Sequence, residues 1–382
     1  MPLLTGTRVL AFENGLAGPL ATRLLADLGA DVIKVERPDG GDVTRAWDTV
    51  AAGLSSGFVW VNRGKRSVAL DVRDPEHRPA VERLIGRSDV VLQNSTPGWA
   101  ERVGLGEEAV RALRPDVVYV DISGYGPDGP YAGKNAYDLV MQGETGLIAV
   151  TGTPADPARV GISVCDVGAG SYAAVATLAA LARRAETGEG ARVSVSLFDT
   201  MVDWLGYFPH LWWHRREAPE RTGMRHPLFC PYGPFPAGDG RLFGFAVLSA
   251  DHWRALCVEV VDKPELLDDP RFATNESRVE HRGLLEPVLE ELFAALPARE
   301  WLDLMEAARI PCGAVNEVPD VVEHPQLAHN GLVVEVDSPA GPIPVVGSPF
   351  LVNGERPPSG PVPGLGEHTA EILAELGLTP PA

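Results

Sequence analysis

One carboxylate in the sequence stands where a nucleophile could act. Asp166 lies within residues 160–170, which read V-G-I-S-V-C-D-V-G-A-G. The pattern predicts a strand over residues 160–164 and a helix over 172–184, separated by a glycine-rich turn, so that Asp166 precedes a helix N-terminus. Two roles are open at this position. Asp166 either caps the helix by accepting backbone hydrogen bonds, or attacks a substrate, the flanking glycines leaving room for a bulky group.

Composition and charge argue against several classes of partner and site. The 382 residues allow two domains, and a net charge of −19 argues against nucleic acid and anionic membranes as partners. The four cysteines are scattered, and the nine histidines show no metal-binding spacing, so we expect no metal site. The sequence has no signal-peptide pattern and no apolar stretch approaching the roughly 18 residues of a membrane span. We therefore expect a cytoplasmic protein that does not span a membrane.

The elements that must position Asp166 alternate between strand and helix. Apolar strands are predicted over 8–12, 31–36, 67–70, 90–93 and 117–122, with helices such as 19–28 between them. This alternation indicates a doubly wound α/β domain with a parallel sheet. An apolar stretch over 197–213 is predicted to be a linker helix, and the composition becomes rich in Pro and Gly from about Phe229. The expected organisation is a large α/β domain over 1–200, a linker over 201–228, a small α+β domain over 229–325, and a C-terminal segment over 326–382 that returns to the large domain.

Three loops could contact a ligand. The first βα turn reads N-G-L-A-G-P rather than G-x-G-x-x-G, which argues against a nicotinamide dinucleotide. Arg37, beside Glu36 at a strand end, suits a phosphate, although a solvated strand end explains both residues equally well. The basic loop Arg63–Arg66 either meets an anion or is an exposed turn. The glycine-rich loop over 123–138 is long enough to be functional, while its tyrosines favour packing.

These segments occur together in a recognisable order. The chain carries L-A-G-P-L-A-T-R-L-L-A-D-L-G-A-D-V-I-K-V-E-R-P, G-D-V-T-R, N-R-G-K-R-S-V-A-L-D, V-L-Q-N-S-T-P-G, D-I-S-G-Y-G-P-D-G-P-Y and T-G-E-G-A-R-V-S-V-S-L-F-D. It resembles the class III CoA-transferases, a family that includes formyl-CoA transferase, carnitine CoA-transferase and the α-methylacyl-CoA racemases. The resemblance implies a Rossmann-like large domain, a smaller α+β domain and an interlocked homodimer of ring-like subunits.

The resemblance also implies a mechanism and a site. Asp166 matches the catalytic aspartate, which attacks an acyl-CoA thioester to give an acyl-aspartyl anhydride and then an aspartyl-CoA thioester that a carboxylic acid resolves. With an ordinary pKa of about 4, Asp166 is expected to be ionised at pH 7. Coenzyme A enters as the thioester substrate, and no tightly bound cofactor is expected. The implied supporting residues are Tyr137, Asp138 and Gly168. The implied CoA contacts are Gly15, Leu16, Arg37, Lys65, Leu70, Asn94, Arg102, Lys134 and Asn135.

Two departures from the family bear on these expectations. Where many transferases have Lys-Ala-Tyr, this chain has Asn135-Ala136-Tyr137, so that the adjacent Lys134 replaces the family lysine. The glycine-rich flap that some members carry is not evident around residues 248–253.

The alternative within the family is a 2-methylacyl-CoA racemase, which acts by α-proton exchange. Racemases carry a histidine before the aspartate of the loop, whereas this chain has Tyr137 before Asp138 and no histidine between His77 and His210. A phenol with a pKa of about 10 is a poor base at neutral pH. A CoA-binding protein without turnover is a further alternative, against which the intact Asp166 argues. The sequence therefore favours the transferase.

Overall fold

The computed structural model describes residues 2–378. The chain forms two compact units. The first comprises the described residues up to Leu147, Val160–Gly206, and the described residues from Gln326 onward. The second comprises Ile148–Arg159 and Tyr207–Pro325. The first unit thus joins N-terminal and C-terminal parts of the chain.

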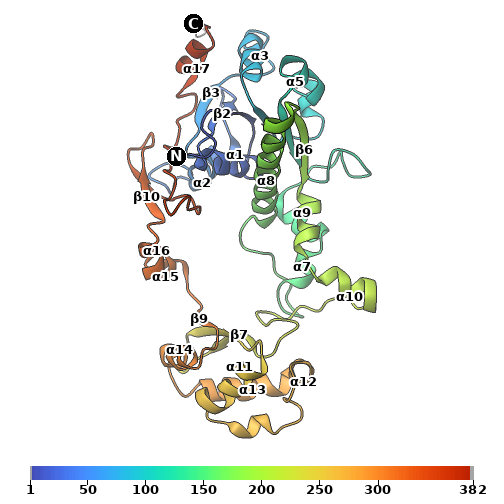
Figure 1. Ribbon diagram of the computed structural model, residues 1–382, viewed down its shortest axis with the longest axis vertical. Coiled ribbons are helices and arrows are strands. Elements are labelled where there is room, and N and C mark those ends of the chain that lie inside the picture. Colours follow the sequence, from blue (N-terminus) through green and yellow to red (C-terminus); the bar gives the residue numbers. More distant parts are fainter. Residues whose placement is uncertain (1, 379–382) are drawn as a thin grey trace. The chain divides into compact units, whose positions relative to one another are not determined.

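A six-stranded parallel sheet forms the centre of the first unit (Figure 1). Its strands are β1 (Arg8–Phe12), β2 (Asp31–Glu36), β3 (Arg66–Ala69), β4 (Val90–Gln93), β5 (Val118–Ser123) and β6 (Ala191–Ser196). They lie in the order β3-β2-β1-β4-β5-β6, which confirms the predicted parallel α/β sheet. Strands β1, β2 and β3 follow one another toward one edge of the sheet and β4, β5 and β6 toward the other, so the progression of strands along the sheet reverses between β1 and β4. In such sheets ligands bind at that reversal, outside the carboxyl ends of the strands.

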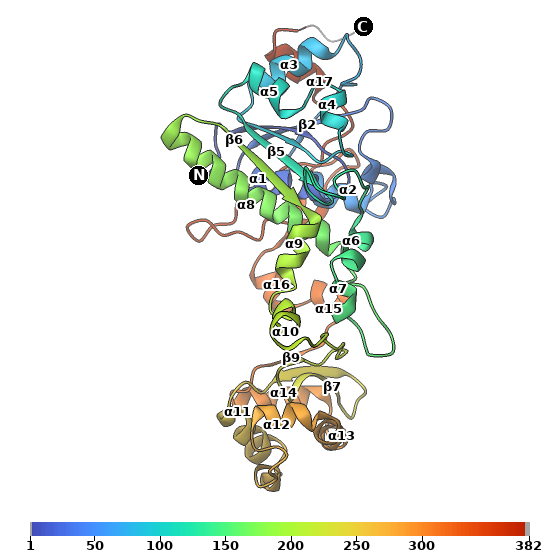
Figure 2. The same ribbon diagram turned by 90° about the vertical axis from the view of Figure 1, so that its right-hand side faces the viewer.

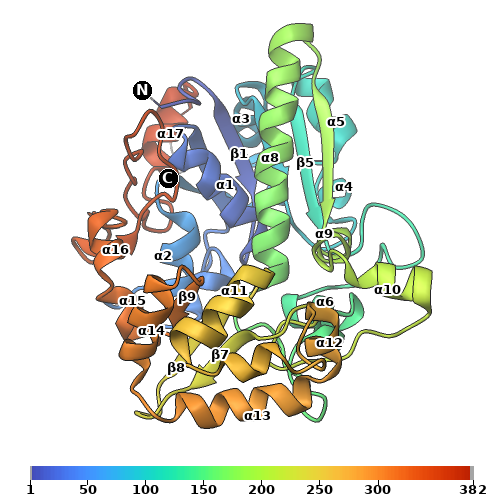
Figure 3. The ribbon, with the colours of Figure 1, turned by 60° about the horizontal axis from the view of Figure 1, so that its bottom comes forward.

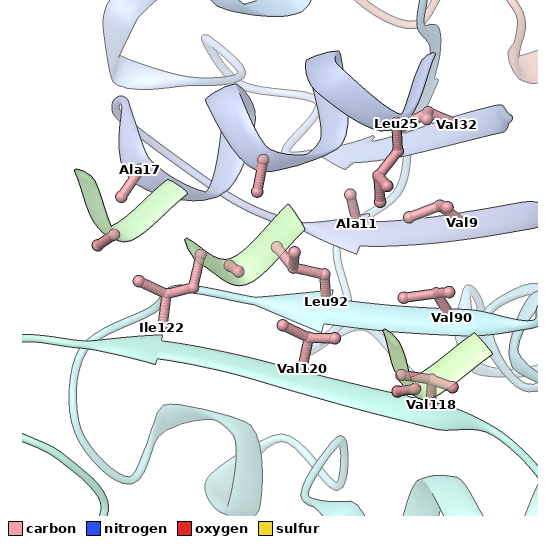
Figure 4. Packing of buried hydrophobic residues seen from close by; sticks show 14 of the residues in the cluster. Val9, Ala11, Ala17, Leu25, Val32, Val90, Leu92, Val118, Val120 and Ile122 are labelled. Atoms are coloured by element: carbon pink, nitrogen blue, oxygen red, sulfur yellow. The ribbon is translucent and has the colours of Figure 1, made fainter. Parts of the chain in front are cut away.

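Alternating residues of the strands face two separate cores. Val9 and Ala11 of β1 belong to the core beneath α1 (Ala17–Asp27) and α8 (Val164–Thr187), as Figure 4 shows for the side chains facing α1. Leu10 and Phe12 belong to the opposite core. That second face is covered by α3 (Arg78–Gly86), α5 (Glu107–Leu113) and α17 (Thr369–Glu375). A period of two along buried strands produces this two-faced packing.

Helix α8 runs beside the sheet (Figure 2). Its 24 residues are long and apolar enough to cross a membrane by length and composition, contrary to the expectation that no segment would be. A core helix passes the same test. The buried residues of α8, including Cys165, Ala169 and Ala173, belong to the core shared with α1 and the sheet, and this packing accounts for their composition.

The remaining elements of the first unit connect or flank the sheet. They are η1 (Val43–Ala46), α2 (Ser56–Asn62), α4 (Trp99–Arg102), α6 (Asp138–Glu144), α9 (Leu197–Trp204), β10 (Val333–Val336) and β11 (Ile343–Val346). Helices α7 (Leu147–Val150) and α16 (Pro325–His329) lie where the chain passes between the two units. Strands β10 and β11 pair as an antiparallel hairpin.

The second unit has an antiparallel sheet of β7 (Tyr232–Pro236), β8 (Leu242–Ala246) and β9 (Cys312–Ala314), packed against helices (Figure 3). Its helices are α10 (Phe208–Arg215), α11 (Ala250–Ala255), η2 (Leu256–Val260), η3 (Pro264–Leu267), α12 (Asn275–Glu280), α13 (Arg282–Phe293), α14 (Ala298–Ala307) and α15 (Val318–Val322). The single linker helix expected over 197–213 is wrong. The chain forms α9 and α10 instead, separated at Gly206, whose positive φ of 60° ends the first helix.

Candidate functional site

Asp166 lies in the first turn of α8, as the third helical residue. The strand predicted over residues 160–164 and the turn predicted after Asp166 are both wrong, because α8 begins at Val164 and continues through Gly168 and Gly170. The N-cap position belongs to Ser163, so the capping role considered for Asp166 is also wrong. A carboxylate in the first helical turn still faces the positive end of the helix dipole.

A second carboxylate stands beside the start of α8. Asp138, the first residue of α6, accepts a hydrogen bond from the backbone N–H of Cys165 through Oδ1 at 2.9 Å. Burial and, secondly, the charge of Asp138 raise the pKa of Asp166 to about 7. The expectation of an ordinary pKa near 4 is therefore wrong. A strongly perturbed carboxylate next to a like charge is typical of catalytic sites.

The glycines that follow Asp166 serve helix packing. A Cβ atom on Gly168 would lie 2.9 Å from Thr200 Cγ2 and 3.0 Å from Met201 Cε of α9. A Cβ atom on Gly170 would lie 2.6 Å from the carbonyl oxygen of Ala17 on α1. Both glycines are buried, so they do not open a path for substrate, and Gly168 allows close contact between α8 and α9. The catalytic support expected from Gly168 stays a prediction.

The loop after β1 is held in place by the end of β4. Asn94 accepts the backbone N–H of Asn14 and donates to the backbone oxygen of Asn14, both at 2.8 Å. The Asn14 side chain accepts the N–H of Val43 at 2.9 Å, which ties the loop to η1. Gly15 adopts a positive φ of 73°, a conformation that glycine favours. This clamp lies at the reversal of strand order, where a ligand is expected.

A buried network of charges supports the same loop. Lys65 Nζ lies 2.6 Å from Glu13 Oε1 and also donates to Asn62, while Lys34 Nζ lies 2.7 Å from Asp42 Oδ2 and 3.3 Å from Glu13. The side chains of Glu13, Lys34, Lys65 and Asp42 are buried. We refer to these four residues as the lysine–carboxylate network. Burial, opposed by Glu13, lowers the pKa of Lys65 to about 7.

This network corrects two expectations. Lys65 does not face a CoA phosphate, because its ammonium group is enclosed and already bound to protein oxygens. The basic loop of Arg63–Arg66 is neither an anion site nor an exposed turn. Arg63 is buried against Asp27, and Arg66 is paired with Asp31, Glu371 and Glu375.

The other expected CoA contacts fall into two groups. Leu16 and Leu70 are buried at the carboxyl ends of β1 and β3. The exposed group comprises Arg37, Arg102, Lys134 and Asn135, and Tyr137, expected as a supporting residue, is exposed as well. The ammonium of Lys134 lies 3.4 Å from the ring centroid of Tyr131, and Tyr137 is 80% exposed just before Asp138. Within residues 2–378, no cluster of three or more His, Cys, Asp and Glu side chains could hold a metal ion.

Sequence reasoning missed Gln142 and Lys34. Gln142 is fully buried, and it donates a hydrogen bond to Asp138 Oδ2 at 2.8 Å. Nothing in its sequence surroundings marks it, because glutamine is ordinary within a helix. Lys34 lies in the middle of the apolar strand D-V-I-K-V-E, and a charge at such a position signals a buried partner.

Comparisons with known proteins bear on the whole chain. The sequence model described as CoA-transferase family III matches residues 4–369. An acyl-CoA transferase of Fusarium pseudograminearum is 37% identical, covering 98% of this chain and 85% of that protein. The succinyl-CoA:glutarate CoA-transferase of Homo sapiens is 36% identical, covering 98% of this chain and 86% of that protein.

A solved structure agrees with these matches. The crystal structure of a CaiB/BaiF family protein from Brucella suis is 35% identical, with a TM-score of 0.86, and the match covers 98% of this chain and 99% of that one. The similarity therefore extends over both units rather than over the parallel sheet alone.

Proposed function

Because the chain belongs to CoA-transferase family III and is a CoA-transferase, we propose that it moves CoA between two carboxylic acids through covalent intermediates on Asp166. The observation that carries this proposal is the place of Asp166. It lies in the first turn of α8, beside Asp138, with a pKa raised to about 7 by burial and by that neighbour. A carboxylate near its pKa at neutral pH is partly ionised, and it is more basic, hence more nucleophilic, than an ordinary aspartate.

The reaction balances without a cofactor. The ionised Asp166 attacks the thioester carbonyl, the carbon–sulfur bond breaks, and an acyl-aspartyl anhydride forms with CoA thiolate. The thiolate attacks the aspartyl carbonyl, which gives an aspartyl-CoA thioester and releases the donor acid as carboxylate. The acceptor carboxylate then attacks that thioester to form a second anhydride and CoA thiolate. Attack of this thiolate on the acceptor carbonyl gives the new acyl-CoA and restores Asp166.

The N-terminus of α8 is suited to stabilise the negative charge that develops in these steps. Each attack creates a tetrahedral oxyanion, and the unpaired N–H groups at a helix N-terminus stabilise negative charge. Asp138 already accepts the N–H of Cys165. The N–H groups of Val164 and Val167 bind the backbone oxygens of Ile162 and Ser163. We therefore assign stabilisation of the oxyanion to the positive end of the α8 dipole.

We propose that the CoA moiety binds at the reversal of strand order. The clamped loop of Asn14–Leu16 and Asn94 presents its backbone there. Arg37 follows β2 and Arg102 ends α4 after β4; both are exposed, and guanidinium groups suit phosphates. Lys134, stacked on Tyr131, offers a further cation on the loop after β5.

The acceptor that we propose is a small dicarboxylic acid. The human relative is named for succinyl-CoA and glutarate, and it is similar to this chain over nearly the whole length. We further propose a homodimer, interlocked as the family resemblance implies. Helix α10 has no buried residue and exposes Trp212 and Trp213, an apolar surface that is typical of an interface. The cytoplasmic location expected from the sequence stays a prediction.

A transfer assay tests the proposal. Succinyl-CoA and glutarate are incubated with the protein, and glutaryl-CoA is measured by chromatography, with other short dicarboxylates as alternative acceptors. Asp166→Asn should lower the rate by at least about 10³-fold, because a neutral amide cannot attack the thioester. The control is Asp199→Asn, which changes an exposed carboxylate in the first turn of α9 and should leave the rate within about twofold.

Full transfer by Asp166→Asn would refute the mechanism. Deuterium exchange into a 2-methylacyl-CoA without an acceptor acid would instead indicate the racemase. No residue that the structure places beside Asp166 favours that alternative, since Tyr137 rather than a histidine precedes Asp138.

A further inference from the structure

Gln142 is a polar side chain at the centre of α6 whose amide is completely enclosed. Its Nε2 donates to Asp138 Oδ2 at 2.8 Å and to the backbone oxygen of Val160 at 3.3 Å. Its Oε1 accepts the backbone N–H of Val160 at 2.8 Å. Both ends of the amide therefore have partners, which a buried amide requires because an unpaired one is costly.

The partners of Gln142 bracket the segment that leads into the nucleophile. The amide binds both backbone groups of Val160, as a neighbouring strand would, so Val160 needs no sheet partner. Asp138, which Gln142 holds through Oδ2, uses its other oxygen to accept the N–H of Cys165. The thiol of Cys165 donates to the backbone oxygen of Asp138 at 3.4 Å. Helix α6 thus anchors the chain at Val160 and again one residue before Asp166.

We propose that Gln142 is a positioning residue of the transfer reaction, which fixes Asp138 against the start of α8 and thereby sets the orientation and charge environment of Asp166. This inference rests on the proposed function of Asp166. With both oxygens of Asp138 engaged, its carboxylate keeps a fixed place beside Asp166. Free Asp166 carries a charge that Asp138 opposes, whereas acylated Asp166 is neutral. Formation of the anhydride or the thioester therefore relieves the repulsion, and a held Asp138 favours acylation.

Loss of Gln142 should affect catalysis more than binding. Without the amide, Asp138 can turn away from Cys165, and the segment from Val160 loses its anchor. A displacement of about 1 Å at a nucleophile can cost about 100-fold in rate, although substrate is still bound by other residues. A purely structural role would instead lower stability and leave the kcat of the folded enzyme unchanged.

The test compares one substitution within α6 with one at its C-cap. Gln142→Met removes the amide at similar length, and Thr145→Val removes one hydrogen bond from another buried side chain of this region, which donates only to the Met141 backbone oxygen. We expect Gln142→Met to lower kcat by about 10- to 100-fold, with KM for acyl-CoA and for the acid within about threefold. Thr145→Val should keep kcat within about twofold. Single-turnover acylation of Asp166, followed by rapid quench and mass spectrometry, should slow to the same extent as kcat in Gln142→Met.

A second variant covers the case in which Gln142→Met does not fold. Gln142→Ala removes the same three hydrogen bonds without adding a charge or a longer side chain, so the same fall in kcat is expected. The inference is overturned if the folded Gln142 variant matches Thr145→Val in kcat, or if only KM changes. An active wild-type protein with an equally active Gln142 variant contradicts the inference alone. Transfer that survives Asp166→Asn contradicts the proposed function itself.

Discussion

Two sets of carboxylates in the first unit lie in contrasting charge environments: the buried Glu13 and Asp42 of the lysine–carboxylate network, and Asp166, which is half-buried in the first turn of α8. In the lysine–carboxylate network, burial acts to raise the pKa of Glu13 and of Asp42, but the neighbouring lysines outweigh it and hold both pKa values below their usual range. At Asp166, burial and Asp138 act in the same direction and raise the pKa to about 7. Asp166 is in none of the ion pairs formed among residues 2–378.

The opposite directions of these pKa shifts distinguish carboxylates that stabilise the fold from a carboxylate that is suited to reaction. Glu13 and Asp42 stay charged and hold the loop after β1, so compensating lysines stabilise them. Asp166, as proposed, changes from anion to neutral acyl derivative and back in each turnover. A fixed cation beside it would stabilise the free anion and oppose acylation. The uncompensated carboxylate is therefore the one suited to chemistry.

Breaking the lysine–carboxylate network should have the largest effect on stability. Lys34→Met leaves Glu13 and Asp42 buried without one of their cations, and removal of one partner from a buried pair costs about 3–5 kcal/mol. Urea unfolding should show this loss. The matched control, Lys263→Met, changes a half-exposed lysine and should cost less than about 1 kcal/mol. Equal unfolding free energies for the two variants would contradict the structural role of the network.

Removing the charge of Asp166 should raise the free energy of unfolding, whereas breaking the lysine–carboxylate network should lower it. The folded-state pKa of Asp166 lies above the ordinary value of about 4, so folding favours the protonated form, and the free energy of unfolding falls as pH rises from about 4 to about 7. Asp166→Asn should therefore stabilise the protein by about 4 kcal/mol near pH 8 and change little near pH 4. Denaturant titrations at both pH values measure the difference. A destabilised Asp166→Asn variant near pH 8 would contradict the comparison.

The glycines of α8 allow a smaller test. Gly168→Ala places a methyl group against Thr200 and Met201, and such overpacking costs about 1–3 kcal/mol. Gly143→Ala, in α6, meets no atom within 4 Å and should stabilise by up to about 1 kcal/mol, because alanine favours helix. Thermal unfolding of both variants checks the opposite signs. A neutral Gly168→Ala would show that α8 and α9 can move apart without cost.

The smallest predicted effect concerns pH. With the pKa of Asp166 at about 7, the rate of acylation should rise with pH to a plateau above about pH 8, and reach only about a tenth of it near pH 6. Asp138→Asn removes the neighbouring negative charge, so the pKa of Asp166 should fall and the rate near pH 6 should reach a larger share, about half or more, of that variant's own plateau. A pH profile of single-turnover acylation measures both shares. An unchanged midpoint would contradict the charge effect of Asp138.

The sequence predicts the scaffold because strand patterns are local. Short runs of apolar residues mark β1, β2, β4 and β5, and the intervening helices make a parallel sheet the expected result. The strand expected over 160–164 fails because both backbone groups of Val160 bind the side chain of Gln142, 18 residues earlier in the chain, and because α8 begins at Val164. No local pattern reports such a pairing.

The functional site likewise contains residues that the sequence predicts and residues whose roles it misjudges. Asp166 and Asp138 are named from the sequence through the family resemblance. The sequence places Gly168 in a turn because glycine permits turns, although a run of small residues equally allows two helices to approach closely. Lys65 is assigned to an anion because its charge is visible, whereas its buried partner Glu13 lies 52 residues away. Charges whose partners are distant in sequence are where the prediction fails.

The most direct measurement traps the acylated nucleophile. The protein is incubated with succinyl-CoA and hydroxylamine, digested, and analysed by mass spectrometry. The proposed mechanism predicts a hydroxamate on Asp166, formed only when acyl-CoA is present and accompanied by loss of transfer activity, because an anhydride or thioester on the aspartate reacts with the amine. Active protein that yields no modification of Asp166, or a modification on another residue, would contradict it.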